Sequence, residues 1–117
     1  MEAIDVYYNP SCSKCIYAVD FLRSQGIEPN LIQYLTESPD FSTLKILIQK
    51  LGLNANDLLR RSEPFFIDNY KDIDLNDDEL IQCMVEYPIL IQRPVLVKGN
   101  FAKICRDEKS LMEFISH

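Results

Sequence analysis

The sequence predicts an α/β fold with a mixed four-stranded sheet, and three observations support this prediction. A chain of 117 residues, 47% of them hydrophobic, has the length and composition of one globular domain with its own core. Strand and helix patterns follow the order β-α-β near the start and β-β-α near the end. The stretch between them has helical patterns only. We therefore expect one domain over residues 1–117, with a sheet core over about 1–36 and 89–117 and a helical insertion over about 37–88.

The first β-α-β unit follows from residue patterns over the first 34 residues. Residues 4–8 are apolar and rich in β-formers, which predicts a strand, and residues 30–34 predict a second one. A helix is predicted over about 13–25, and Gly26 suits a left-handed C-terminal cap. The residues on one face of this helix are Cys15, Ala18, Val19 and Leu22.

The insertion is predicted to contain two clear helices and one weakly marked helix. The turn at 37–40 leads into a helix that ends near Leu51 and is stopped by Gly52. A short helical piece is expected at about 56–61. The acidic segment 68–79 is predicted to lie on the surface and to end in a helix start, since Asn76 and Glu79 have capping-box spacing. That helix is expected to stop at Pro88.

The C-terminal β-β-α unit is predicted from a hairpin signal. Residues 94–98 predict a strand, Gly99-Asn100 a tight turn, and the next strand ends near Cys105. Residues 107–117 then predict a helix. Its inward-facing residues are expected to be Leu111, Phe114 and Ile115.

Charge and hydropathy limit the partners and the location. With 18 acidic and 12 basic residues the net charge is −6, which disfavours nonspecific binding to nucleic acid or a membrane surface. The first residues lack the basic and apolar segments of a signal peptide, and no apolar run approaches the roughly 20 residues of a membrane helix. We therefore expect a cytoplasmic protein, in which cysteines serve redox chemistry or metal binding more often than structural disulfides.

Cys12 and Cys15 lie at the junction between the first strand and the first helix. Exposed N–H groups and the helix dipole favour a thiolate there, so Cys12 is the candidate nucleophile and Cys15 its candidate resolving thiol. A cysteine pair at this junction, with this order of elements, indicates a thioredoxin-like fold. The alternatives are two small buried hydrophobic residues or a zinc site.

The other cysteines and the histidine narrow the chemistry. Cys83 and Cys105 are isolated in sequence, which disfavours zinc, so no metal is expected, and Cys83 is predicted to lie in the core. The one histidine is His117, so a Ser-His or Cys-His dyad of the hydrolase type is disfavoured. Activation of Cys12 is then expected from helix N–H groups, Lys14 or arginines.

Three arginines stand beside apolar elements: Arg60, Arg93 and Arg106. The alternative for each is a solvated cation or a surface ion pair. Arg93 precedes Pro94 at the start of a strand that faces the cysteine loop, where thioredoxin-like folds have a cis peptide bond, so a cis Pro94 is expected.

Together these motifs resemble the ArsC-type, glutaredoxin-linked arsenate reductases and, more distantly, the transcription regulator Spx. The resemblance covers essentially the whole chain and is carried by residues 8–13, 34–35, 58–60, 77–81, 87–94 and 105–106. It implies that Cys12 is a nucleophile and that Arg60, Arg93 and Arg106 bind an oxyanion. Two positions differ from the family pattern: Tyr8 stands where the best-matched reductases have histidine, and Cys15 where serine is common.

Three functional hypotheses follow. The first is thiol-dependent reduction of arsenate to arsenite, as in arsenic resistance, with no bound cofactor. Glutathione with glutaredoxin, or thioredoxin after internal resolution by Cys15, would then be the external reductant. The second is an Spx-like regulator, in which oxidation of an accessible Cys12–Cys15 pair changes binding to RNA polymerase. The third is a general thiol-disulfide oxidoreductase whose arginines bind glutathione or another anion.

Overall fold

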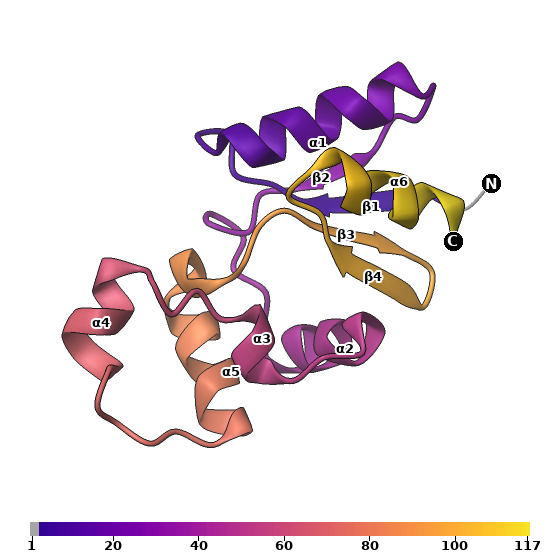
Figure 1. The fold of residues 1–117 in the computed structure, drawn as a ribbon. Helices are drawn as coiled ribbons and strands as arrows, with labels where there is room; N and C mark the ends of the chain where they lie inside the picture. Colours follow the sequence, from indigo (N-terminus) through magenta and orange to yellow (C-terminus); the bar gives the residue numbers. More distant parts are fainter. Residues whose placement is uncertain (1–2) are drawn as a thin grey trace. The chain divides into compact units, whose positions relative to one another are not determined.

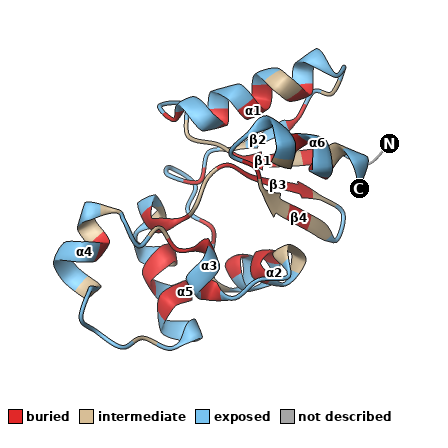
Figure 2. Ribbon diagram, in the orientation of Figure 1, coloured by how far each residue is buried: buried red, intermediate tan, exposed pale blue. Residues whose placement is uncertain are grey.

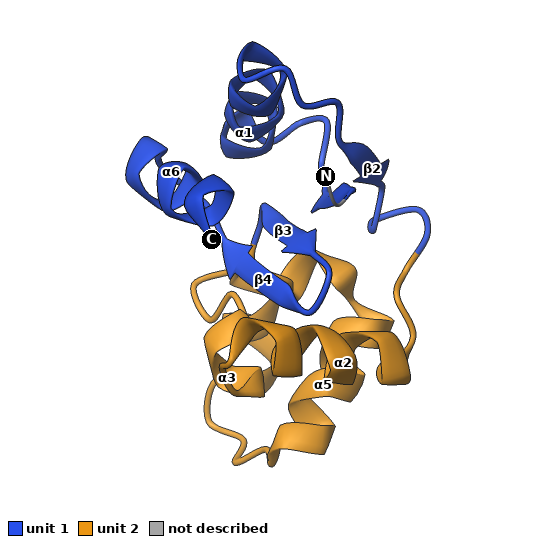
Figure 3. Ribbon diagram, turned by 90° about the vertical axis from the view of Figure 1, so that its right-hand side faces the viewer, with its two compact units in different colours: residues 1–37, 93–117 blue, residues 38–92 orange. Residues whose placement is uncertain are grey.

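The computed structural model describes residues 3–117 and contains a four-stranded sheet and six α-helices in the described part of the chain (Figure 1). The chain divides into two compact units, unit 1 over 1–37 and 93–117 and unit 2 over 38–92 (Figure 3). No helix within residues 3–117 is long and apolar enough to cross a membrane.

Unit 1 contains the sheet, whose strand order is β2-β1-β3-β4. Strand β1 (Ile4–Tyr7) pairs in parallel with β2 (Asn30–Ile32) and antiparallel with β3 (Val95–Lys98). Strand β4 (Phe101–Ile104) pairs antiparallel with β3 across a two-residue turn in which Gly99 has φ 59°. The sheet is therefore mixed and four-stranded, as predicted.

Two helices of unit 1 pack on one face of this sheet, α1 (Ser13–Ser24) and α6 (Glu108–Ser116) (Figure 1). The predicted inward face of α1 is confirmed, since all four of its residues are buried, and Leu111 and Phe114 of α6 are buried as well. Ile115 is only half-buried. The shared core consists of Ile4, Val6, Ala18, Val19, Leu22, Leu96, Cys105, Leu111 and Phe114. The order β-α-β and β-β-α around a mixed sheet gives a thioredoxin-like fold.

Unit 2 is helical, with α2 (Phe41–Leu51), α3 (Ala55–Leu58), α4 (Pro64–Tyr70), α5 (Asp77–Glu86) and a 3-10 turn, η1 (Pro88–Leu90). Helix α5 packs against α2, α3 and η1 and carries the largest buried face of the unit (Figure 2). The predicted capping box of Asn76 and Glu79 is present, and Gly52 ends α2 at φ 68°, a conformation that favours glycine.

Two elements have clearly different bounds from the sequence prediction, and one helix was not predicted. Strand β2 stops at Ile32 instead of continuing to 34, and α3 spans 55–58 instead of 56–61. Helix α4 was not predicted, although Pro64 at its first turn is a helix-start signal. Helix α4 is mostly exposed (Figure 2), and its only buried residue is Phe66. The ring of Phe65 contacts Tyr87, with ring centroids 4.4 Å apart. Because α4 buries so few apolar residues, its sequence shows no clear helical spacing of apolar residues.

Candidate active site

A tight turn between β1 and α1 positions Cys12. The Asn9 carbonyl accepts a hydrogen bond from the Cys12 N–H at 3.0 Å, and the Asn9 side chain accepts one from the Ser11 N–H at 2.9 Å. This Asx-type turn leaves Cys12 with extended backbone at the N-cap position of α1. Side chains at an N-cap face the unpaired N–H groups of the first helical turn. The local sequence therefore directs the Cys12 sulfur toward those donors.

The surroundings of Cys12 stabilise its thiolate. Only 7% of the residue is exposed, and burial alone raises its pKa. Hydrogen bonds from the Cys15 N–H, the Arg93 guanidinium, the Cys15 thiol and the Lys14 N–H more than offset this effect and lower the pKa from 9.0 to about 7. A large fraction of Cys12 is thus the nucleophilic thiolate at neutral pH.

Cys15 has the opposite character. It is 0% exposed, and burial, together with the neighbouring Cys12, raises its pKa to about 12. The expectation of an accessible pair is therefore wrong for Cys15, which lies on the inward face of α1. The two thiols are free and adjacent, one poised as an anion and the other held neutral.

Arg93 contacts Cys12 from the start of β3. The residue is half-buried, the Arg93–Pro94 peptide bond is cis, and the guanidinium hydrogen-bonds the Cys12 sulfur. Its Nε is buried and has no hydrogen-bond partner among the described residues. Buried guanidinium donors are normally paired. Arg93 therefore has a free N–H donor close to the thiolate, and that donor can bind a ligand.

The β3–β4 hairpin brings Arg106 to Arg93. Val95 pairs with Ile104, and the same register, continued away from the turn, sets Arg93 opposite Arg106. Arg106 Nη1 donates a hydrogen bond of 2.6 Å to the Arg93 carbonyl, and the rest of this exposed side chain keeps further donors. Arg93 thus contacts Cys12 directly, and Arg106 bonds the backbone of Arg93.

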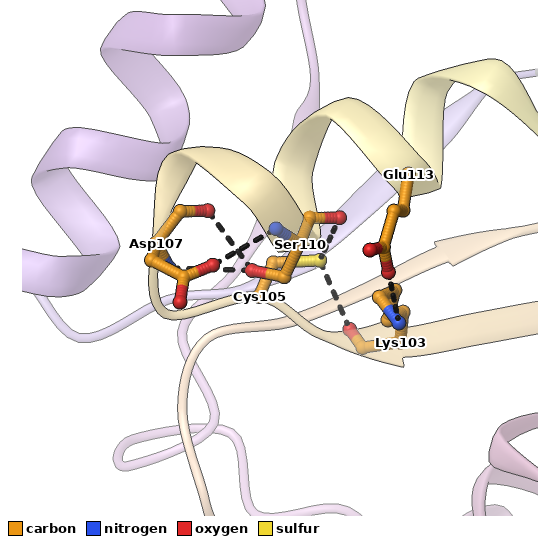
Figure 4. A network of polar contacts seen from close by, with 5 residues as sticks. All are labelled: Lys103, Cys105, Asp107, Ser110 and Glu113. Carbon is orange, nitrogen blue, oxygen red and sulfur yellow. Dashed lines mark hydrogen bonds and ion pairs between the residues drawn. The ribbon is translucent and has the colours of Figure 1, made fainter.

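The backbone on both sides of Arg106 is fixed by the polar network in Figure 4. The Cys105 thiol contacts the carbonyls of Lys103 and Ser110, both at 3.6 Å. The Asp107 carboxylate accepts the Ser110 N–H at 2.8 Å, and the Ser110 hydroxyl accepts the Asp107 N–H at 3.2 Å. This reciprocal cap defines where α6 begins and so holds the residue before it. Sequence analysis missed this role, although Asp107 and Ser110 have the spacing of a capping pair.

The third predicted arginine lies in unit 2. The Arg60 N–H bonds the Leu90 carbonyl at 2.7 Å, and its Nη1 bonds the Ile89 carbonyl at 2.9 Å. Nη1 also lies 3.3 Å from the Glu63 carboxylate, which the sequence did not single out. The structure thus places Cys12, Cys15, Arg93 and Arg106 in one unit and Arg60 in the other.

Cys83 and Tyr8 both lie in or against the packed interior of their units. Cys83 is buried in α5, as predicted, and burial raises its pKa. Tyr8, at the position where the best-matched reductases have histidine, is half-buried and packs against the core of unit 1. Within residues 3–117, no group of three or more histidine, cysteine, aspartate or glutamate side chains is arranged to hold a metal ion.

Comparisons with known proteins identify the family of the chain. The model of the ArsC family matches residues 7–114. The chain is 34% identical to an arsenate reductase of Escherichia coli over 98% of its own length and 82% of that protein. It is 35% identical to the "Uncharacterized protein YfgD" of Escherichia coli K12, over 97% of this chain and 98% of that one. The structure of an arsenate reductase from Vibrio cholerae superposes with a TM-score of 0.90 at 38% identity, covering 96% and 97% of the two chains. On this match, which spans nearly the whole sequence, the chain belongs to the ArsC family.

Proposed function

We propose that this protein reduces arsenate to arsenite by covalent catalysis at Cys12. The observation that carries the proposal is the contact between the Cys12 sulfur, whose pKa is about 7, and the Arg93 guanidinium, which has an unpaired donor. The backbone carbonyl of Arg93 accepts a hydrogen bond from Arg106. A thiolate next to unsatisfied guanidinium donors suits attack on a small oxyanion. The arsenate reductases of Escherichia coli and Vibrio cholerae named above support arsenate as that anion.

In the first step the arginines bind and orient the anion. Arsenate is tetrahedral and negatively charged at neutral pH, and forked guanidinium donors match pairs of its oxygens. The Cys12 thiolate attacks the arsenic of dihydrogen arsenate and a sulfur–arsenic bond forms, while one hydroxyl group takes the proton of the other and leaves as water. Arg93 and Arg106 stabilise the charge on the remaining oxygens. By family resemblance, Arg60 is proposed as the third oxyanion ligand.

In the second step a thiolate attacks the Cys12 sulfur of this adduct. A disulfide bond forms, the sulfur–arsenic bond breaks, and its electron pair stays on arsenic, which leaves as arsenite. Cys15 would give an internal disulfide that a protein dithiol such as thioredoxin reduces, whereas glutathione would give a mixed disulfide for glutaredoxin. The proximity of Cys15 favours the internal route, because a tethered thiol has a high effective concentration. Its pKa of about 12 disfavours that route, because little thiolate is present at neutral pH.

The test is arsenate-dependent oxidation of a thiol reductant, with arsenite measured as the product. Wild-type protein is assayed with glutathione plus glutaredoxin and separately with thioredoxin plus its reductase. Cys12→Ser is the inactive control, and Cys15→Ser separates the two routes, because it stops turnover only with thioredoxin if Cys15 is the resolving thiol. The proposal would be refuted if no arsenite formed with glutathione plus glutaredoxin and none formed with thioredoxin plus its reductase. Loss of activity in Arg60→Ala with an unchanged Cys12 alkylation rate would support Arg60 as an anion ligand.

A second candidate function, general thiol-disulfide exchange, is favoured by one observation. Cys12 and Cys15 are in hydrogen-bond contact, and their pKa values of about 7 and about 12 suit a dithiol with one attacking and one buried sulfur. This candidate predicts reduction of disulfide substrates at a rate that arsenate and sulfate do not change. If an oxyanion binds at Arg93 and Arg106, arsenate inhibits this exchange in competition with the disulfide.

A further inference from the structure

Three aromatic side chains of unit 2 meet where α4 lies beside the C-terminal end of α5 (Figure 1). The ring centroids of Phe65 and Tyr87 are 4.4 Å apart, and those of Phe65 and Tyr70 are 6.3 Å apart. Phe65 and Tyr70 are half-buried and Tyr87 is exposed, so the three residues form a partly exposed aromatic surface. Aromatic side chains are enriched in protein interfaces, which makes this surface a candidate for docking.

The aromatic surface is held in place by the residues beneath it. The ring of Tyr70 also contacts the buried ring of Phe66, with centroids 5.7 Å apart. The Tyr70 side chain hydrogen-bonds Cys83 of α5. Burial, Cys83 and Tyr87 raise the pKa of Tyr70, and the nearby Glu86 carboxylate adds to this effect. Rings that are positioned before a partner arrives lose less conformational entropy on binding.

The chain around the aromatic surface is acidic. Residues 63–86, which contain α4 and α5, include eight acidic residues and one basic residue, Lys71. Four of the carboxylates form no ion pair with any residue in the part of the chain that the structure describes: Asp68, Asp72, Asp74 and Glu86. Of these, Glu86 precedes Tyr87 in the chain and lies close to Tyr70. The rings are therefore surrounded by negative charge that the protein itself does not neutralise.

This charge excludes several kinds of partner. A second copy of this chain has the same acidic segment and would be repelled by it. Nucleic acids and anionic lipid surfaces carry dense negative charge and would be repelled as well. A basic protein segment is attracted instead. Among basic side chains, arginine suits this surface best, because its guanidinium group both stacks on aromatic faces and pairs with carboxylates in a fork.

We propose that the aromatic surface docks a basic segment of a partner protein through arginine side chains. One guanidinium group lies on the ring of Tyr87 and pairs with the Glu86 carboxylate, and other cations of the segment face the carboxylates of residues 68–74. Lysine fits less well, because its ammonium group is a point charge without a flat face. The proposal goes beyond arsenate reduction and does not rest on it, since none of the residues assigned to that reaction belongs to this surface.

The experiment measures binding of three fluorescently labelled peptides of equal length to the full chain by anisotropy. In these peptides arginine, lysine or glutamate alternates with serine. We expect the arginine peptide to bind about threefold to tenfold more tightly than the lysine peptide, and the glutamate peptide not to bind.

Two substitutions of Tyr87 separate the aromatic face from apolar contact. Tyr87→Leu removes the face but keeps an apolar side chain, so it should weaken binding of the arginine peptide by about threefold. Tyr87→Phe keeps the face and should leave the affinity unchanged. Glu86→Gln removes the paired charge and should weaken binding by about threefold as well.

Tyr17→Leu and Asp20→Asn are the matched controls, because they make the same chemical changes at exposed positions of α1 in unit 1. Neither should change the affinity for the arginine peptide by more than about 1.5-fold. Urea unfolding of every variant checks that the fold is intact, so that a loss of binding reports on the surface itself.

The proposal is overturned if the arginine peptide binds no more tightly than the lysine peptide, or if Tyr87→Phe weakens binding as much as Tyr87→Leu. Equal losses in Asp20→Asn and Glu86→Gln would also overturn it, because a long-range field would then explain the binding. Sedimentation tests the remaining occupant. A dimer of the wild-type chain that Tyr87→Leu abolishes would assign the surface to a second copy instead. None of these measurements uses arsenate, so their outcome is independent of the proposed reduction.

Discussion

Helices α1 and α6 of unit 1 begin in opposite ways. Helix α6 has a complete reciprocal cap between Asp107 and Ser110, and Glu108 adds an acidic side chain to its first turn. Helix α1 has no oxygen cap and no acidic residue in its first turn, and its N-cap residue is Cys12. The N–H groups of Lys14 and Cys15 face the Cys12 sulfur instead. The N–H groups at the start of α6 donate to oxygen atoms, and those at the start of α1 donate to a thiolate.

This difference shows how a helix start becomes reactive. A carboxylate at the N-cap satisfies the free N–H groups and neutralises the positive end of the dipole, which stabilises the helix. At α1 the same donors are available to lower the pKa of Cys12, and no acidic side chain in the first turn opposes the thiolate. The donors that stabilise α6 therefore serve nucleophile activation in α1.

The largest expected effect on activity comes from replacing the Cys12 sulfur at the start of α1 with an oxygen. Cys12→Ser removes the thiolate, so we expect arsenate reduction to fall by more than about 10³-fold. Serine is a preferred N-cap, whereas Cys12→Ala lacks any cap and should be less stable than Cys12→Ser by about 1 kcal/mol. Urea unfolding of both variants measures this difference. Two inactive variants of equal stability would show that the sulfur position does not act as a cap.

Arg93→Ala tests the hydrogen bond that the Cys12 thiolate receives from outside α1. The substitution removes a hydrogen bond from the Cys12 thiolate and an anion ligand, so we expect turnover to fall by about 10²-fold to 10³-fold. The pKa of Cys12 should rise from about 7, as seen in the pH dependence of alkylation by iodoacetamide. Arg23→Ala, which removes an exposed ion pair between α1 and Glu28, should change neither property. An unchanged alkylation profile in Arg93→Ala would contradict the assigned contact.

The thiolate should also appear in the pH dependence of stability. The pKa of Cys12 is about 7 in the folded protein and 9.0 without the fold, so the unfolded state binds more protons between these values, and stability rises with pH. The stabilisation is present above the unfolded value and is lost as the pH falls through 7. We expect the free energy of unfolding of wild type, minus that of Cys12→Ser, to rise by about 2 kcal/mol between about pH 6 and pH 9. A flat difference would show that Cys12 is not a stabilised anion.

Much of this arrangement was predictable from the sequence, because it depends on local patterns. The buried face of α1, the Asn76 capping box and the Gly99-Asn100 turn all follow from spacing and residue type. The two-residue turn also sets the strand register that places Arg93 opposite Arg106. The bond of the Arg60 side chain to the Ile89 carbonyl joins segments that are 29 residues apart, which no local pattern encodes.

The smallest expected effect comes from opening the cap of α6. Asp107→Ala should cost about 1 kcal/mol of stability, and so should Asn76→Ala, which removes the equivalent capping box of α5 in unit 2. Only Asp107→Ala should also slow arsenate reduction, by roughly threefold, because the α6 cap holds the backbone next to Arg106. Asp107→Asn restores a good N-cap without the charge, so it should recover both stability and rate if the cap is what matters. A rate that stays low in Asp107→Asn would instead assign the effect to the carboxylate charge beside Arg106.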